Sequence, residues 1–208
     1  MTTQTTQATQ ATRTAHDGQD GETTGAARTA RTIRAAHETR VGPAGAAAAP
    51  AADPSAGGRP RLDFARSAPK AFRALVGFDA AARAGLDPAL VELIQIRASH
   101  LNHCAYCLHM HTSDARRAGE SEERLHMVAV WREARHFFTP REQAALALTE
   151  AVTLVADRGV PDEVYAEAAA RFDDEELGQV LALISAINTW NRVALATAKR
   201  AGTDERRR

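Results

Sequence analysis

Beyond about residue 60, apolar residues recur at intervals of three and four positions, which is the period of an α-helix. Glycines, prolines and capping residues divide this pattern into segments of helical length. The pattern predicts helices over 69–84, 87–101, 103–118, 121–135, 139–155 and 161–172, and a long one from 173 through at least 195. No segment shows the convincing alternation of a strand. The predicted fold class is therefore all-α.

Local signals support these boundaries. Gly85 and Gly119 follow two of the segments and are typical helix-stop residues. The capping box, in which a polar N-cap and a glutamate three residues later satisfy each other's backbone N–H groups, occurs twice. Its two copies are Thr139 with Glu142 and Asp173 with Glu176.

The first 60 residues differ in composition from the rest of the chain. They are rich in Ala, Thr, Gln and Gly and contain no aromatic residue and no cysteine. Such a segment buries too little apolar surface to offset its loss of conformational entropy, so we predict a disordered tail over 1–60. No apolar stretch typical of a secretory signal follows Met1. A helical domain over 61–200 and a short charged end over 201–208 complete the predicted organisation.

Charge and hydropathy exclude some classes of partner. The chain has 26 basic and 26 acidic residues, a formal net charge of zero and an isoelectric point near 7.1, so nothing in its charge favours nucleic-acid binding. No apolar run reaches the ~18 residues that a membrane span requires. Two cysteines without an export signal fit a reducing cytoplasm, where thiols are more often catalytic or metal-binding than structural. We therefore expect a cytoplasmic protein without nucleic-acid or membrane partners.

The only two cysteines, Cys104 and Cys107, lie in the string H-L-N-H-C-A-Y-C-L-H-M-H at 100–111. Residues three apart on a helix have β-carbons about 5–6 Å apart, whereas a relaxed disulfide needs about 3.8 Å. A bridge between these cysteines would be strained, and strained disulfides are typically the labile or catalytic ones. The spacing therefore indicates a pair that cycles between thiols and a disulfide.

Two arguments identify different thiols as the activated one. If the helix begins near His103, Cys104 lies in its first turn, where the helix dipole favours a thiolate. His111, however, follows Cys107 by one helical turn and could act as its base. Glu92 completes the pattern E-x11-C-x2-C-x3-H and could accept a proton through a histidine or a water, unless it is a solvated helix carboxylate. The spacing alone leaves both assignments open.

Residues 92–149, which carry this pattern, and the later I-N-T-W-N-R at 187–192 resemble the alkylhydroperoxidase D and carboxymuconolactone decarboxylase superfamily. The resemblance is greatest to its alkylhydroperoxidase-like branch, which has paired cysteines. It implies an all-helical peroxidase in which Cys107 is the peroxidatic thiol, Cys104 the resolving thiol, and Glu92 with His111 the proton relay. The implied partners are a hydroperoxide substrate, a dithiol, thioredoxin or lipoyl-type reductant, and further copies of the chain in a homo-oligomer. We expect no cofactor and no metal.

Two positions depart from the pattern of that branch. Tyr106 stands where the best-known members have a histidine, which puts a relay role for that position in doubt. His103 stands where related sequences commonly have glycine, and its bulk could crowd the site. Asn191 and Arg192 resemble a recurring family feature, which we interpret as a polar pair for helix packing or an interface.

Three alternatives remain from the sequence. A decarboxylase-like activity is less favoured, because that branch works without the cysteine pair. A non-enzymatic redox sensor would use the same thiols without turnover. A zinc site is also possible, but ligands spaced along one helix cannot all reach one tetrahedral centre. Its candidate ligands are His100, His103, Cys104, Cys107, His109 and His111.

Overall fold

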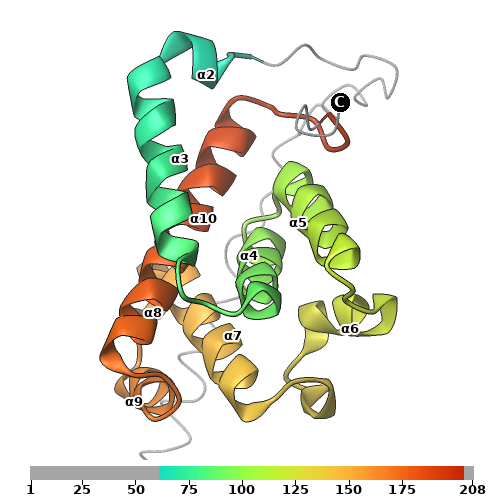
Figure 1. The fold of residues 1–208 in the computed structure, drawn as a ribbon, viewed down its shortest axis with the longest axis vertical. Helices are drawn as coiled ribbons and strands as arrows, with labels where there is room; N and C mark the ends of the chain where they lie inside the picture. The colour runs from blue at the N-terminus through green and yellow to red at the C-terminus, as the bar shows by residue number, and fades with distance from the viewer. Residues whose placement is uncertain (1–60, 204–208) are drawn as a thin grey trace, which may run out of the picture. The chain divides into compact units, whose positions relative to one another are not determined.

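The computed structural model describes residues 61–203, and every regular element in that range is helical (Figure 1). The predicted tail over 1–60 and the last residues, 204–208, lie outside the described part of the chain. The α-helices are α2 (Phe64–Ser67), α3 (Pro69–Arg83), α4 (Pro88–Leu101), α5 (Ala105–Arg117), α6 (Glu122–Met127), α7 (Pro140–Thr153), α8 (Val155–Arg158), α9 (Asp162–Ala169) and α10 (Asp174–Ala196). Two short 3₁₀ helices, η1 (Val128–Val130) and η2 (Arg135–Phe137), lie between α6 and α7. The all-α prediction is confirmed.

Helix α4 occupies the centre of this arrangement and packs against α5, α7 and α10. From Leu90 to Leu101 none of its residues is exposed, so the helix is enclosed on all sides. Ile94 belongs to an apolar cluster with α7, α9 and α10, whereas Ile96 belongs to a second cluster around Trp131. Ala98, near its end, packs with the two cysteines. One helix therefore connects the main core to the cysteine site.

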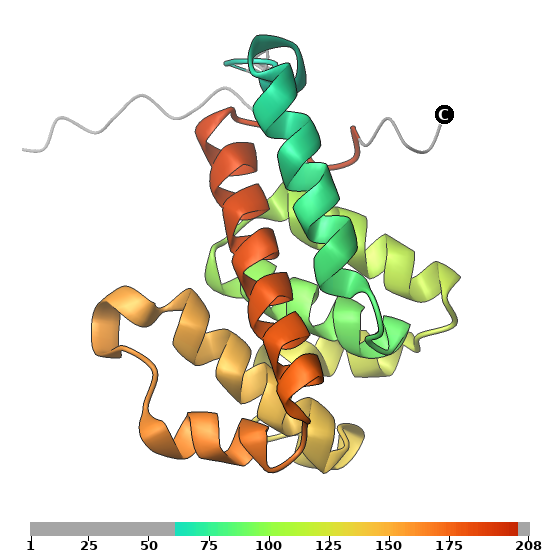
Figure 2. The same ribbon diagram turned by 60° about the vertical axis from the view of Figure 1, so that its left-hand side comes forward.

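Helix α10 runs alongside α3 and crosses α4 (Figure 2). Its start is fixed by the predicted capping box, in which Asp173 accepts the N–H of Glu176 and the Glu176 carboxylate accepts the N–H of Asp173. The capping box of Thr139 and Glu142 at the start of α7 is also confirmed.

Apolar residues on the outer sides of α3 and α10 are partly open to solvent, including Val76 and Leu195. Among the described residues, no helix is both long and apolar enough to cross a bilayer.

The helix predicted over 121–135 is the main correction to the sequence analysis. Helix α6 ends at Met127, and the chain continues through two 3₁₀ turns. Tertiary contacts account for the break, because the Ala129 carbonyl accepts a hydrogen bond from Arg97 at 2.9 Å and the Trp131 indole N–H donates to Glu150 at 2.7 Å. Arg97 on α4 and Glu150 on α7 thus hold a carbonyl and an indole of this segment in positions that a continuous helix over 121–135 would not give them. The segment predicted over 161–172 is also shorter, because α9 ends at Ala169.

The junction between α4 and α5 positions the cysteines. The N–H of Cys104 donates to the Ser99 carbonyl at 3.0 Å and that of His103 donates to the His100 carbonyl at 3.1 Å. This is a Schellman motif, which needs a left-handed residue at its turn, and His103 has φ 55°. Helix α5 then begins at Ala105, so Cys104 is its N-cap residue and not part of its first turn. The predicted start at His103 was therefore early.

The backbone at His103 is one that glycine adopts more readily than histidine, since its φ is 55°. A left-handed conformation costs a non-glycine residue about 1–2 kcal/mol, and glycine avoids that cost. We predict that His103→Gly raises the free energy of unfolding by about 1 kcal/mol in urea denaturation. His109→Gly is the control, because it places glycine in the exposed interior of α5 and should lower that free energy by about 0.5 kcal/mol. Equal destabilisation by both variants would contradict the strain at His103.

Candidate active site

Cys104 and Cys107 are buried together beneath α10. Each is 1% exposed, both are free thiols, and their sulfur atoms are 2.8 Å apart. As the N-cap of α5, Cys104 accepts the backbone N–H of Cys107 on its Sγ at 3.4 Å. Ala98, Ile187 and Ala194 surround the pair with apolar contacts. The structure thus places the two sulfurs close enough to share a proton and to react with each other.

The two thiols have opposite pKa shifts because each is the other's nearest partner. The hydrogen bond from the Cys107 thiol lowers the pKa of Cys104 to about 7, although burial opposes the shift. Smaller contributions in the same direction come from the N–H of Cys107, the Asn191 side chain and the N–H of Tyr106. The same hydrogen bond raises the pKa of Cys107, as do burial and the charge on Cys104. The cysteine pair therefore loses one proton near neutral pH and retains the second.

This arrangement bears on the two assignments left open by the sequence. The N-terminal position of Cys104 on α5 agrees with a resting thiolate on that sulfur, as the dipole argument predicted. The role of Cys107 as the attacking thiol, which the family resemblance implies, stays a prediction. Because a proton shared over 2.8 Å can reside on either sulfur, the resting charge does not by itself identify the attacking atom.

Glu92 reaches from α4 to the buried His111 on α5. The Nδ1 atom of His111 is 2.9 Å from Oε2 of Glu92. His111 is 1% exposed, and the Glu92 side chain only 12% exposed, so Glu92 is not a solvated helix carboxylate. His111 lies one helical turn after Cys107, and both are on the buried side of α5. The structure thus joins Glu92 to His111 and places this pair on the same helix face as the cysteines.

Arg83, at the end of α3, is a further partner of Glu92. Its Nη1 atom lies 3.4 Å from Oε1 of Glu92, while its Nε donates to Asp79 at 2.8 Å. The two Glu92 oxygens therefore have different partners, one cationic and one imidazole. An acceptor beside Nδ1 favours the tautomer with its proton on that nitrogen and leaves Nε2 as a lone-pair base. Glu92 can thus orient His111 for proton transfer.

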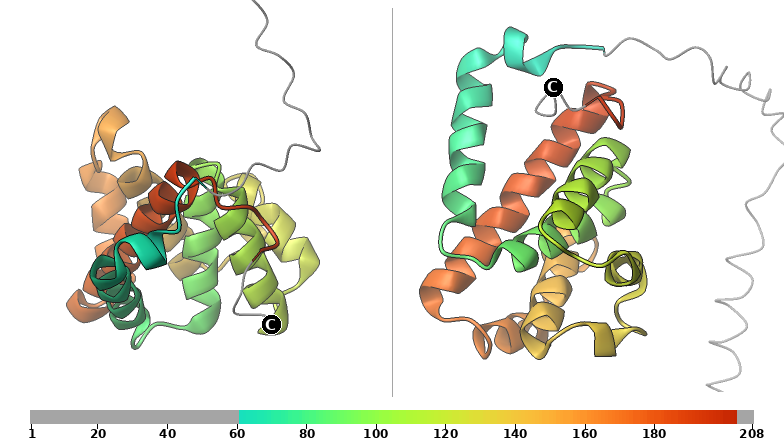
Figure 3. Two further views of the ribbon diagram at one scale, coloured as in Figure 1. Left: turned by 90° about the horizontal axis from the view of Figure 1, so that it is seen from above. Right: turned by 45° about the vertical axis from the view of Figure 1, so that its right-hand side comes forward.

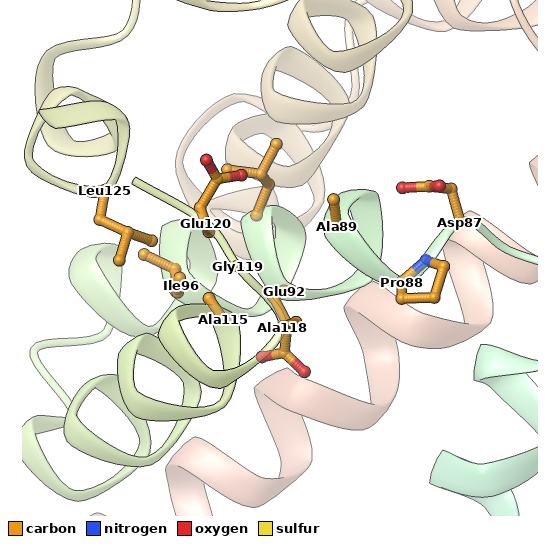
Figure 4. A pocket seen from close by; sticks show the side chains of 11 residues that line it. Asp87, Pro88, Ala89, Glu92, Ile96, Ala115, Ala118, Gly119, Glu120 and Leu125 are labelled. Atoms are coloured by element: carbon orange, nitrogen blue, oxygen red, sulfur yellow. The ribbon is translucent and has the colours of Figure 1, made fainter. Parts of the chain in front are cut away.

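A cavity of about 240 Å³ adjoins Glu92 between the start of α4 and the end of α5 (Figure 4). Glu92 and Ile96 line it from α4, and Ala115 and Ala118 from α5, whereas neither cysteine does. Figure 4 shows the Glu92 side chain extending from α4 toward the part of α5 that carries Ala118. The cavity therefore adjoins the carboxylate end of the site and not the sulfurs.

The alternative zinc cluster does not assemble around the cysteines. Within residues 61–203, the one set of three ligand atoms close enough for a metal ion is Glu92, His111 and Asp114, which contains no cysteine. His103 and His109 are exposed. His103 therefore does not crowd the sulfurs as its size suggested. Tyr106 does pack against the cysteine cluster, and the Lys199 ammonium lies 4.6 Å from its ring centre.

Sequence reasoning missed several groups that act on the site. Asn191 is completely buried and lowers the pKa of both thiols, and the charge of Lys199 lowers that of Cys107. From the sequence, Asn191 is interpreted only as a packing or interface residue, and neither Arg83 nor Lys199 is singled out. For Asn191 a signal was present, because a polar residue interrupts the apolar stripe formed by Ile184, Ile187 and Ala194 on α10. For Arg83 and Lys199 no local pattern distinguished them from other surface cations.

Comparisons with known proteins agree with this fold. Residues 69–151 match the carboxymuconolactone decarboxylase family. The uncharacterized protein YdfG of Bacillus subtilis (strain 168) is 44% identical over 112 residues, which cover 54% of this chain and 76% of YdfG. This chain belongs to the carboxymuconolactone decarboxylase family. The family falls in the superfamily that includes alkylhydroperoxidase D, so the resemblance is confirmed.

Two solved structures extend the comparison. A protein of unknown function from Agrobacterium tumefaciens, with a suggested role in antioxidant defence as an AhpD protein, is 35% identical with a TM-score of 0.67. The match covers 70% of this chain and all of that one. A peroxidase-related protein from Ralstonia eutropha JMP134 is 23% identical with a TM-score of 0.59 over 68% of this chain and 75% of its own. That second likeness concerns the fold alone.

The shared proton of the cysteine pair predicts a thiol that reacts at neutral pH. The rate of alkylation by iodoacetamide should rise with pH around a midpoint of about 7, because the thiolate is the nucleophile. Cys107→Ala removes the donor to Cys104, so the midpoint should move up toward the ~8.5 of a free cysteine. Mass spectrometry of timed samples measures both. A wild-type midpoint at or above that of a free cysteine would contradict the prediction.

Proposed function

We propose that this protein is a thiol-dependent peroxidase that reduces organic hydroperoxides or hydrogen peroxide. The observation that carries the proposal is the pair of sulfurs 2.8 Å apart, with one pKa lowered to about 7, on the same helix face as the His111–Glu92 pair. A peroxidatic thiol needs to be deprotonated at neutral pH, to have a proton source for the leaving oxygen, and to have a second thiol within reach. All three requirements have candidate residues here.

In the proposed reaction, Nε2 of His111 takes the proton of the Cys107 thiol, and the resulting thiolate attacks one oxygen of the hydroperoxide. The O–O bond breaks, the sulfur is oxidised to a sulfenic acid, and the departing alkoxide takes a proton from His111 to leave as an alcohol. Cys104 then attacks the sulfenic sulfur, a disulfide forms, and the hydroxide that leaves is protonated to water. Each catalytic turnover therefore consumes one hydroperoxide and yields an alcohol, water and a disulfide, with the two electrons supplied by the cysteine pair.

A dithiol would return the site to its reduced form. Thiol–disulfide exchange proceeds through a mixed disulfide, so the reductant must reach one sulfur of the pair. Both sulfurs are almost completely buried, which favours a slender dithiol, such as a lipoyl group, over direct contact by a folded thioredoxin. The two electrons that the disulfide receives come from that dithiol, which becomes oxidised.

Separate cysteine variants test the roles of the two thiols. We expect Cys107→Ser to abolish turnover of cumene hydroperoxide with dihydrolipoamide as donor. Cys104→Ser should also stop multiple turnover but still consume one equivalent of peroxide, leaving a sulfenic acid at Cys107 that dimedone traps. If dimedone instead traps a sulfenic acid at Cys104 in Cys107→Ser, and none at Cys107 in Cys104→Ser, the two cysteines have the opposite roles. Absence of turnover in wild-type protein with every hydroperoxide and donor would reject the peroxidase proposal and favour a redox sensor.

Glu92→Gln tests the relay. The amide keeps the size of the side chain but removes the negative charge that stabilises a protonated His111, so kcat/KM for the peroxide should fall about 100-fold or more. Glu150→Gln is the matched control, because Glu150 is an equally buried carboxylate paired with Arg97 and Trp131 and not with the site. It should lower stability with little effect on kcat/KM. Similar losses of kcat/KM in both variants would mean that Glu92 acts only through the fold.

A further inference from the structure

Two cavities flank α5, and their linings carry opposite charges. Figure 3 shows α5 lying alongside α4, with α6 following it. The cavity of about 240 Å³ beside Glu92 is lined by three carboxylates and, among the described residues, by no basic one; we call it the acidic cavity. The other, of about 380 Å³, is lined by His100, His109, Arg116 and His126 and, within the same part of the chain, by no acidic residue; we call it the basic cavity.

Of the two, the acidic cavity is the one that reaches the Glu92–His111 pair. Glu92 lines it, and Oε2 of this carboxylate is 2.9 Å from Nδ1 of His111. A carboxylate has about four acceptor positions, of which Arg83 and His111 each occupy one. Glu92 can therefore also accept the O–H of a molecule in the cavity. A hydroperoxide bound in this way lies beside His111, which is one helical turn from Cys107.

The floor of the acidic cavity is apolar. Leu93, Ile96, Ala115 and Leu125 line it, are between 0% and 4% exposed, and belong to one apolar cluster (Figure 4). An engineered apolar cavity of about 150 Å³ is large enough to hold benzene. A volume of about 240 Å³ therefore accommodates a benzene ring with a few further carbon atoms. The floor thus suits a compact hydrocarbon group.

Carboxylates make the rest of the acidic cavity unfavourable for an anion. Asp87 is exposed, and Glu120 is partly exposed. The one printed cation beside Glu120 is Arg124, at 3.7 Å, and Arg124 is shared with Glu142. An anionic group entering this cavity would meet like charges, which cost free energy at close range. An uncharged molecule does not incur this cost.

We propose that the acidic cavity binds the organic part of the hydroperoxide and selects compact, uncharged hydroperoxides over those that carry a carboxylate, such as fatty-acid hydroperoxides. This inference rests on the proposed peroxidase function and names its substrate class. The hydrocarbon group lies on the apolar floor, and the hydroperoxide group faces Glu92 and His111. Hydrogen peroxide has no organic part, so its reduction does not depend on the floor.

Steady-state kinetics of the full-length protein test the position of the substrate. Ala118 lines the acidic cavity, is exposed and has right-handed helical backbone, so Ala118→Leu adds bulk to the cavity without straining the fold. It should raise KM for cumene hydroperoxide about tenfold, the effect of a methylene or two in an apolar pocket. The kinetics with hydrogen peroxide should not change. Ala89→Leu, which adds bulk from the α4 side, should act in the same way.

Thr112→Leu is the matched control, because Thr112 lies on the same helix but lines the basic cavity. It should leave KM for cumene hydroperoxide unchanged. An unchanged KM in both Ala118→Leu and Ala89→Leu would overturn the inference, as would an equal rise in Thr112→Leu. Either result in a protein that still reduces cumene hydroperoxide would leave the proposed function standing.

Binding of an unreactive ligand tests the selection against charge without turnover. The probe is 2-phenyl-2-propanol, the alcohol that cumene hydroperoxide yields, titrated into the protein and followed by NMR. Its para-carboxylate derivative should bind at least about tenfold more weakly. Glu120→Gln should narrow that difference, because it removes one negative charge from the cavity. Equal binding of the two ligands to the wild-type protein would overturn the inference. Selective binding of the alcohol by a protein that reduces no peroxide would support the site while rejecting the proposed function.

Discussion

The double role of Cys104 at the junction of α4 and α5 is the constraint on which the site depends. Its backbone N–H closes the Schellman motif at the end of α4, and its sulfur caps the start of α5. These two bonds fix where α5 begins and turn it back along α4. Cys107 then lies beside Cys104, and His111 lies opposite Glu92. The left-handed backbone at His103 is the local strain that this tight connection requires.

The site keeps charge in a largely apolar environment by giving each polar group a partner. One proton is shared between two sulfurs, Glu92 is held between Arg83 and His111, and the buried amide of Asn191 has acceptors and a donor on its two sides. Buried polar groups are costly when unpaired and strong when paired. The same burial that protects a thiolate from competing reactions therefore also strengthens the interactions that produce it.

The site also extends beyond the part of the chain that defines its family. The carboxymuconolactone decarboxylase match covers 69–151 and includes Glu92, both cysteines and His111. Asn191 and Lys199 come from the end of α10 and its C-terminal turn, outside that match. The match therefore includes the candidate reacting residues but not the part of α10 that packs over the cysteines.

The helical class, both capping boxes and the shared face of Cys107 and His111 could be predicted from the sequence, because these depend on spacing along a single helix. The break after Met127, the pairing of Glu92 with His111, and the hydrogen bonds of Asn191 to Asn102 and Ser99 follow from the tertiary structure alone. These features need side chains from different helices to meet. Periodicity identifies the buried face of each helix, but not which residue of another helix lies opposite it.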